Sequence, residues 1–183
     1  MKRISSITLK RLLILAVVLA SIPLHSAVKG MVWFQEKELI NDWEEAPTFI
    51  LSDAEGRKYH LVAFRKEPVM LIFCDPNENA CHTQAGVMKP FAENYVHRGL
   101  NILFVLESPS VGQMNQFEEK MDVDVLVLRD PGARIRNKFN VESFPTVYFI
   151  DKAGYVRFSQ AGLVRERWGK IRKLIEQLIG EEM

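Results

Sequence analysis

The sequence contains few of the residues that build metal centres or disulfide frameworks. Its 183 residues include two cysteines, Cys74 and Cys81, and four histidines. Two cysteines can form at most one disulfide, which excludes a disulfide-rich scaffold. A structural zinc site needs four closely spaced ligands, and these cysteines and scattered histidines do not supply that pattern. We therefore expect neither a metal ion nor another cofactor, and we look for chemistry at the two thiols.

An excess of charge of either sign is also missing. The chain has 24 Lys and Arg residues against 23 Asp and Glu residues, which gives a formal net charge of +1. Nucleic-acid-binding domains concentrate positive charge, so we expect no nucleic-acid partner. The composition, 48% hydrophobic and 26% charged, is ordinary for a globular protein. The length allows one domain of usual size with a sizeable core.

The sequence lacks an uninterrupted apolar run long enough for a typical membrane-spanning helix. Its most apolar segment, Leu12–Leu24, has 13 residues, whereas a spanning helix needs about 20. Basic residues, and no acidic ones, precede this segment: Lys2, Arg3, Lys10 and Arg11. A basic start followed by a short apolar core is typical of a secretory signal or a short anchor. Such basic residues favour keeping the N-terminus in the cytoplasm and exporting the rest.

These features divide the chain into three predicted parts. Residues 1–28 are predicted to be a signal peptide or a membrane-anchor helix, residues 29–45 a linker, and residues 46–183 one folded domain. We expect that domain to be extracytoplasmic, on the periplasmic or cell-surface side. It would be either anchored to the membrane through the N-terminal segment or secreted.

Residues 69–95 carry both cysteines and form the centre of the predicted domain. Val69–Phe73 is a short apolar run typical of a buried central strand. A polar turn follows, and Cys81 then lies where a helix is expected to begin. Apolar residues at four-residue spacing predict this helix over residues 83–97. Pro90 lies within it and should bend or interrupt it, because the proline ring clashes with the preceding turn.

Strands and helices alternate through the rest of the domain. The apolar patterns predict an extended segment and a returning strand at 46–51 and 58–62, alternating strands and helices at 101–106, 112–120, 124–128 and 133–139, a hairpin at 147–150 and 155–158, and an amphipathic helix at 166–179. Alternation in the first part requires parallel crossovers, whereas the late hairpin is antiparallel. We therefore predict an α/β fold with a mixed central sheet and helices on both faces.

Two stretches of the domain resemble motifs of one family. The segment APTFILSDAEGRKYHL, which starts at Ala46, resembles the A-P-x-F-x-L-x-D-x-x-G opening of thioredoxin-fold redoxins. The segment FNVESFPTVYFIDKAGYVRFSQAGL, which starts at Phe139, resembles their V-x-x-x-P-T-x-F-x-I-D-x-x-G-x-V ending. The resemblance covers residues 46–163 and is greatest to the membrane-anchored TlpA/ResA type within the AhpC/TSA-redoxin superfamily.

The resemblance implies a fold and the position of a site. It implies a thioredoxin-like three-layer fold, with a signal or anchor helix before the domain. It also implies that Pro145 follows a cis peptide bond and faces the reactive cysteine. Phe144 and Thr146, the neighbours of this proline, would then belong to the same substrate-binding loop.

The active-site motif departs from the family pattern. The family has Trp-Cys-x-x-Cys at the start of the helix, and counting back from the end of this helix aligns Cys81 with the first of those cysteines. The second position holds Gln84, so the motif reads Cys81-His82-Thr83-Gln84 and lacks one cysteine. The preceding loop is longer than in the family, and it begins with Cys74.

The two thiols have different predicted roles. A thiol at a helix N-terminus lies near unpaired backbone N–H groups that favour the reactive thiolate, which makes Cys81 the candidate nucleophile. Cys74 follows a buried strand and could be a resolving thiol, a disulfide partner or an inert core residue. The six intervening residues let the loop fold back into disulfide geometry. Outside the cytoplasm such a bridge could persist.

Three classes of function fit these residues. In a thiol–disulfide oxidoreductase, which we expect here, Cys81 attacks a disulfide of a protein partner and Cys74 resolves the mixed disulfide. A thiol peroxidase would act on a peroxide instead. Peroxiredoxins carry Thr or Ser three residues before the reactive cysteine, and this chain has Glu78, whose carboxylate would repel a thiolate. The third class is a non-catalytic thioredoxin-fold domain that binds or scaffolds a partner.

Other polar side chains near the motif have open roles. His82 either stabilises a Cys81 thiolate as a cation or is a solvated residue of the first helical turn. Gln84 either makes a hydrogen bond near the site or lies on the surface. Three basic residues of the segment 133–139 are expected to form a solvated face and not an anion site: Arg134, Arg136 and Lys138.

Overall fold

The computed structural model describes residues 44–121 and 125–180. These residues belong to one compact unit, Glu36–Met183. The predicted signal or anchor helix and most of the predicted linker lie outside the described residues. Within the described ranges, no helix is both long and apolar enough to cross a membrane.

The described strands form one seven-stranded mixed sheet in the order β2-β1-β5-β4-β3-β6-β7. Their bounds are β1 Ile50–Ser52, β2 Lys58–His60, β3 Val69–Cys74, β4 Asn101–Glu107, β5 Leu126–Asp130, β6 Thr146–Ile150 and β7 Val156–Ala161. Strands β3, β4 and β5 are parallel to one another. The other pairs, including the β6–β7 hairpin, are antiparallel. The predicted mixed sheet is therefore confirmed.

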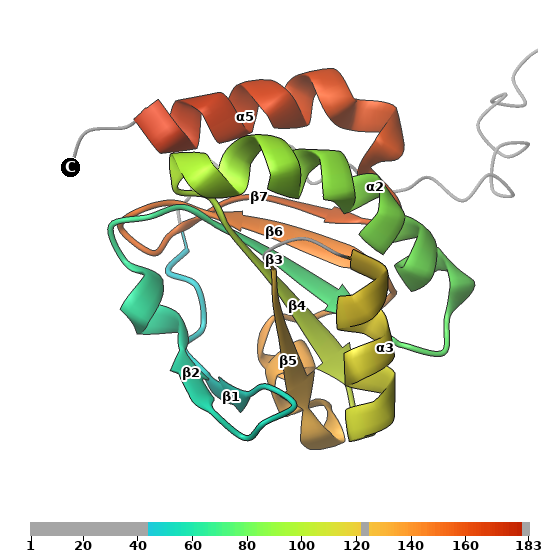
Figure 1. The fold of residues 1–183 in the computed structure, drawn as a ribbon. Coiled ribbons are helices and arrows are strands. Elements are labelled where there is room, and N and C mark those ends of the chain that lie inside the picture. The colour runs from blue at the N-terminus through green and yellow to red at the C-terminus, as the bar shows by residue number, and fades with distance from the viewer. Residues whose placement is uncertain (1–43, 122–124, 181–183) are drawn as a thin grey trace, which may run out of the picture. The chain divides into compact units, whose positions relative to one another are not determined.

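Helices cover both faces of this sheet. The α-helices are α2 Asn79–Tyr95, α3 Val111–Met121, α4 Arg134–Lys138 and α5 Trp168–Gly180, and the short 3₁₀ helices are η1 Leu61–Phe64, η2 Val96–Arg98, η3 Pro131–Ala133 and η4 Val164–Arg167. Helices α2, α3 and α5 pack against one face, and Figure 1 shows α2 and α5 side by side. Helix α4 and η1 pack against the other. This arrangement is the three-layer thioredoxin-like fold.

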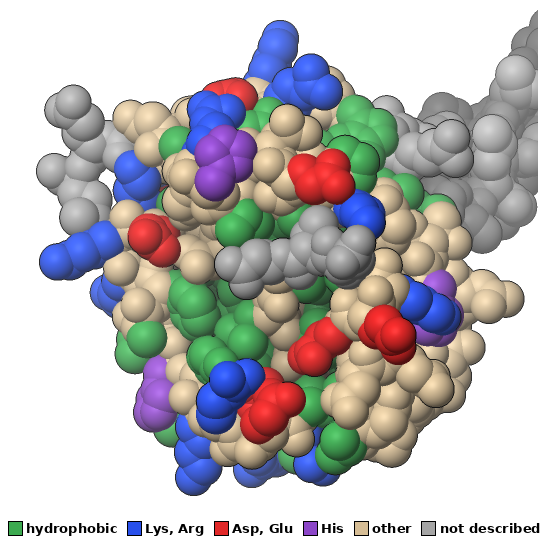
Figure 2. Space-filling model, viewed as in Figure 1, with side chains coloured by type: hydrophobic (Ala, Val, Ile, Leu, Met, Phe, Trp, Pro, Cys, Tyr) green, Lys and Arg blue, Asp and Glu red, His purple; other side chains and the backbone are tan. Residues whose placement is uncertain are grey.

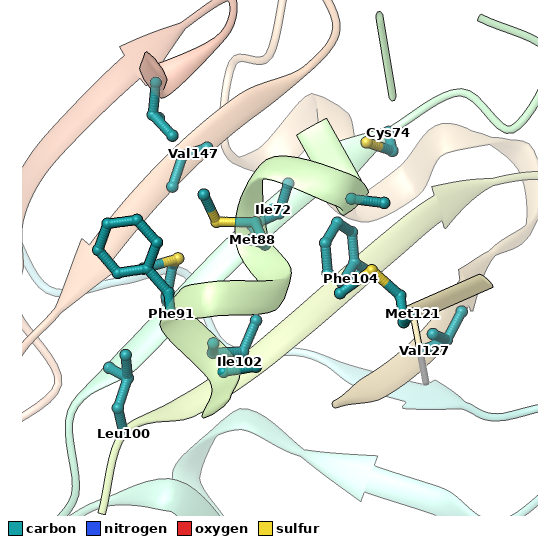
Figure 3. Close-up of a cluster of buried hydrophobic side chains, with 14 of the residues drawn as sticks. Ile72, Cys74, Met88, Phe91, Leu100, Ile102, Phe104, Met121, Val127 and Val147 are labelled. Carbon is teal, nitrogen blue, oxygen red and sulfur yellow. The ribbon is translucent and has the colours of Figure 1, made fainter. Parts of the chain in front are cut away.

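Strand β3 supplies the centre of the core, because all six of its residues are buried. Successive side chains of a strand point to opposite faces. Ile72 and Cys74 accordingly pack in the cluster beneath α2, α3 and α5, together with Phe104 and Met88 (Figure 3). Phe73 packs in the cluster on the opposite face. Burial on both faces explains why this strand is continuously apolar in sequence.

Helix α2 differs from its prediction in two ways. It begins at Asn79, earlier than the predicted residue 83, and it continues through Pro90. Of the two predicted effects of Pro90, interruption does not occur, and the helix axis bends along its length (Figure 1). Proline removes only one backbone hydrogen bond, while buried Met88 and Phe91 hold the helix against the sheet on either side of it.

Two other boundaries shift because of pairing in the sheet. Strand β5 extends to Asp130, two residues beyond its prediction, since Arg129 pairs with β1 and Asp130 pairs with β4. At the N-terminal side, the backbone N–H of Val156 donates to the carbonyl of Glu44 over 3.0 Å. The last residues of the predicted linker therefore contact the β7 hairpin.

The surface mixes charges of both signs. Figure 2 shows Lys, Arg, Asp and Glu side chains interspersed over the face seen in Figure 1. The exposed large apolar residues come from separate elements: Ile50, Val62, Val111 and Tyr155. This distribution matches the near-neutral net charge of the chain.

Candidate functional site

The two cysteines meet at the junction between β3 and α2. Cys74 is the last residue of β3, and Cys81 is the third residue of α2. Both are free thiols with 0% of their surface exposed, and Cys81 is close enough to raise the pKa of Cys74. Cys74 lies at the end of the buried cluster drawn in Figure 3. The structure thus brings the two predicted site thiols into contact.

Burial raises the pKa of the Cys74 thiol well above its ordinary value. The nearby side chain of Cys81 raises this pKa further, and the charges of Glu78 and Asp75 act in the same direction. A thiolate is disfavoured where solvation is lost and where negative charges are near. Cys74 is therefore a protonated thiol at neutral pH.

The loop between the cysteines is fastened at three points. Asn77 donates its backbone N–H to the Asp75 carboxylate over 2.8 Å. The Gln113 Nε2 group at the start of α3 donates to Asn77 Oδ1 over 3.0 Å. His82 Nε2 lies 2.9 Å from the Pro76 carbonyl oxygen. Since that oxygen can only accept, Nε2 is the protonated ring nitrogen. These bonds fix the conformation of the loop that joins the two buried thiols.

Gln113 is a site residue that sequence reasoning missed. Its Oε1 accepts the backbone N–H of Ser110 over 3.0 Å, and its own backbone N–H donates to Ser110 Oγ over 3.2 Å. These reciprocal bonds form a capping box at the start of α3. The Ser-x-x-Gln pattern could have revealed the cap. It could not have revealed that the same amide also reaches Asn77.

Gln84 and Glu78 lie on opposite sides of the first turns of α2. Gln84 is fully buried, and its Oε1 accepts the backbone N–H of Val164 over 3.3 Å. The amide in the position of the missing cysteine therefore ties α2 to η4. Glu78 is the N-cap residue, but its side chain makes no capping hydrogen bond. Its exposed carboxylate is one of the charges that raise the pKa of Cys74.

The predicted proline loop lies against the same core. The Phe144–Pro145 peptide bond is cis, as predicted. Phe144 packs against the buried cluster that contains both cysteines. Thr146 donates its hydroxyl to the Ser143 carbonyl over 2.6 Å, and the Pro145 carbonyl accepts the Gly162 N–H over 2.7 Å. The loop is thus fixed internally and to the residue that follows β7.

Arg136 corrects the prediction of a solvated basic face. Arg134 and Lys138 are exposed, but only 28% of the Arg136 side chain is exposed. Its guanidinium Nη1 donates to the Glu107 carboxylate over 3.0 Å, and its carbon lies 4.9 Å from the centre of the Phe144 ring. Arg136 therefore contacts the proline loop and is only partly exposed to solvent. Neither contact is readable from the local sequence.

These features define the class of protein. A mixed sheet with this strand order, a helix that starts with a buried thiol and a cis-proline loop packed on the same core together define a thioredoxin-like redoxin. The sequence profile of the AhpC/TSA family matches residues 43–159. The chain belongs to the AhpC/TSA family.

Individual proteins agree with this assignment. The thiol-disulfide oxidoreductase ResA of Geobacillus thermodenitrificans is 29% identical over 125 residues, which cover 68% of this chain and 72% of that protein. The chloroplastic peroxiredoxin Q of Populus jackii is 27% identical over 146 residues, 75% of this chain and 66% of that protein. The predicted resemblance to ResA-type redoxins is thereby confirmed.

A solved structure supports the fold independently. A DsbE-type protein of Chlorobium tepidum superposes with a TM-score of 0.69 and covers 75% of this chain and 97% of that protein. The identity between the two sequences is 21%. This likeness concerns the fold, and it confirms the predicted thioredoxin-like architecture.

Proposed function

We propose that this protein is a thiol–disulfide oxidoreductase that acts through Cys81 and Cys74. The observation that carries the proposal is the contact between the two free thiols at the β3–α2 junction, beside the cis-proline loop. Contact between the side chains is what disulfide formation requires. The printed activity of the ResA relative supports the same class of reaction.

The proposed reaction proceeds through two exchange steps. The Cys81 thiolate attacks one sulfur of a protein disulfide, forms a mixed disulfide and releases the other partner sulfur, which takes up a proton. Cys74 then attacks the Cys81 sulfur, and its proton goes to the second partner sulfur as that sulfur leaves. The partner disulfide gains two electrons and two protons, and the cysteine pair becomes a disulfide. A dithiol reductant returns the pair to the free thiols.

The assignment of roles follows from the surroundings of each thiol. Cys74 is the better resolving group, because burial raises its pKa and keeps it protonated until Cys81 is bound to the partner. Cys81 is the better attacking group, because it lies in the first turn of α2. Gln84 cannot resolve a mixed disulfide, and its amide is engaged with Val164.

The buried thiols require the covering loop to move before a protein partner can react. Both cysteines have 0% exposure, whereas the bond from Gln113 to Asn77 is exposed to solvent. Exposed hydrogen bonds are among the first to open in a native protein. Opening of this bond would let residues 75–80 move away from the thiol pair.

Residues 1–28 complete the proposal as a signal peptide or membrane anchor, followed by a linker to about residue 45 and the redoxin domain. The basic and apolar pattern of that segment supports an extracytoplasmic position, where disulfide partners are found. The N-terminal residue of the mature chain, determined by mass spectrometry of membrane and soluble fractions, distinguishes a cleaved signal from an anchor.

A peroxide is the second candidate substrate, because peroxiredoxin Q is among the relatives. Against it, Glu78 occupies the place of the peroxide-positioning Thr or Ser, and a carboxylate there opposes formation of a thiolate. The reduced chain should therefore consume hydrogen peroxide far more slowly than it reduces a protein disulfide. Faster reaction with peroxide would favour the peroxidase.

A single-turnover experiment tests the proposed function. The reduced full-length chain, freed of reductant, is mixed with insulin, and insulin thiols are counted with time. The wild-type chain should reduce one disulfide per molecule, and Cys74→Ser should stop as a mixed disulfide between insulin and Cys81. Cys81→Ser should be inactive. A wild-type chain that leaves insulin disulfides intact would contradict the proposal. It would favour the third class of function, a non-catalytic domain that binds or scaffolds a partner.

A further inference from the structure

Arg136 connects three segments that meet beside the thiol pair. Its Nε donates to the Val141 carbonyl over 3.0 Å. Its Nη1 donates to the carboxylate of Glu107, the last residue of β4. Its guanidinium also lies over the Phe144 ring. One side chain thus joins the end of the sheet to both ends of the 141–144 segment.

The backbone of Arg136 is fixed as firmly as its side chain. The buried carboxylate of Asp130 accepts the backbone N–H groups of Ile135 and Arg136, both through Oδ2, over 2.9 and 2.8 Å. Asp130 is itself the last residue of β5. The end of β5 therefore fixes the backbone position from which the Arg136 side chain extends. A planar guanidinium also presents its N–H groups as a rigid fork and stacks on aromatic rings.

Phe144 carries the effect of Arg136 to the thiols. This ring packs against the cluster with Cys74 and Cys81 and also against the cluster on the opposite face of the sheet. It directly precedes Pro145 in the cis peptide. The Phe144 ring therefore links the proline loop to the core that contains both thiols. The contacts of Arg136 hold that ring in place.

We propose that Arg136 is a positioning residue that holds the Phe144–Pro145 loop as the docking surface for disulfide-bonded polypeptides. The inference rests on the proposed thiol–disulfide exchange. It adds a residue outside the family motifs to that reaction, because a polypeptide needs the loop as well as a thiol. A small aromatic disulfide needs only the thiol. Replacement of Arg136 should therefore weaken the binding of polypeptide disulfides without changing the intrinsic reactivity of Cys81.

Two variants of Arg136 test the inference. The limiting rate and the half-saturating concentration are measured in single turnovers with insulin, and the rate with the small disulfide 5,5′-dithiobis(2-nitrobenzoate) is measured beside them. Arg136→Met should raise the half-saturating insulin concentration about tenfold and leave the small-disulfide rate unchanged. Arg136→Lys should behave similarly, because an ammonium keeps the charge but loses the fork and the stacking.

Arg98→Met is the matched control. Arg98 pairs with Glu176 through two hydrogen bonds, and its guanidinium lies 5.2 Å from the centre of the Tyr95 ring. It follows the far end of α2, away from Cys81. This variant loses the same kinds of contact but should keep wild-type kinetics with both disulfides.

The possible outcomes separate this inference from the proposed function. If the wild-type chain reduces neither disulfide, the proposed function fails and the inference fails with it. If the wild-type chain reduces both and Arg136→Met keeps the wild-type half-saturation, the inference alone is wrong. Equal losses with insulin and the small disulfide would indicate general damage to the site and would also overturn it. A wild-type chain that reduces the small disulfide but not insulin would contradict both the inference and the proposed function.

Discussion

The thiol of Cys74 is kept protonated by its surroundings. It is buried at the end of β3 and lies near Cys81 and the carboxylates of Asp75 and Glu78, all of which raise its pKa. An unfolded chain would expose the same thiol to water, where its pKa is about 8.5. The folded and unfolded states therefore bind different numbers of protons at alkaline pH.

This difference predicts how stability depends on pH. Below about pH 8.5 the Cys74 thiol is protonated in both states, so its contribution is fully present. Above that pH the unfolded chain releases the proton while the folded chain keeps it, and the free energy of unfolding falls by up to about 1.4 kcal/mol per pH unit. Urea titrations of the reduced protein from pH 7 to 10 measure this loss.

Cys74→Ser is the control for that titration, since serine does not ionise in this range. The difference in unfolding free energy between the reduced wild-type chain and the variant should narrow as the pH rises. A difference that stays constant from pH 7 to 10 would show that the surroundings of Cys74 do not hold its proton.

The loop of residues 75–80 leads to a second prediction, which concerns Asn77. Asn77→Ala removes the acceptor of the Gln113 amide, a bond of 3.0 Å. An average hydrogen bond contributes about 1 kcal/mol, so alkylation of Cys81 through the opened loop should become about fivefold faster. The rate is measured with iodoacetamide in a Cys74→Ser background.

Asn101→Ala is the matched control, because Asn101 donates an equally exposed side-chain hydrogen bond to Glu67 over 2.8 Å. Its alkylation rate should equal that of the Cys74→Ser background alone. Equal acceleration in both variants would indicate global loosening, and no acceleration with Asn77→Ala would exclude residues 75–80 as the cover.

Residue by residue, the site was predictable only where it lies within a motif. The cis peptide before Pro145 was predicted because its neighbours in sequence are characteristic, whereas Cys81 was proposed by counting back along the helix. The bond between Asn77 and Gln113 and the bond from Arg136 to Glu107 join segments that are distant in sequence. Such contacts depend on how the loops fold, and no local pattern encodes them.

At the scale of elements, Gln84 gives α2 a connection to η4. Gln84→Ala would leave the buried N–H of Val164 without its partner. An unsatisfied buried donor lowers the free energy of unfolding by about 1–3 kcal/mol, which urea denaturation measures. Thr83→Ala, the exposed neighbour in the same turn, should change it by less than about 0.5 kcal/mol. A Gln84→Ala variant with an unchanged free energy of unfolding would show that this bond does not hold α2 and η4 together.

Most elements could be predicted, because buried strands and amphipathic helices have regular apolar periods. Their ends were less predictable. Strand β5 continues to Asp130 because its neighbours in the sheet pair that far. Helix α2 continues through Pro90 because apolar residues on both sides of the proline are buried. In both cases tertiary packing overrides the local signal.

At the scale of the whole molecule, the sheet gathers the candidate site from four places. The end of β3 brings Cys74, the start of α2 brings Cys81, the start of α3 secures their loop, and the turn before β6 supplies Pro145. The family motifs could predict the fourth contribution, alignment along the helix located the second, and the apolar strand pattern placed Cys74 at the end of a strand. They could not predict the third, which depends on how α3 packs beside α2.

The central claim is that Cys74 and Cys81 act as one redox pair, which converts between two thiols and one disulfide. The most direct test equilibrates the full-length chain in glutathione buffers of increasing oxidation, quenches it in acid and determines its disulfides by peptide mass spectrometry. The account predicts one transition, in which a peptide pair linked through Cys74 and Cys81 replaces both free thiols. Separate glutathione adducts on the two cysteines, or thiols that stay free in the most oxidising buffer, would contradict it.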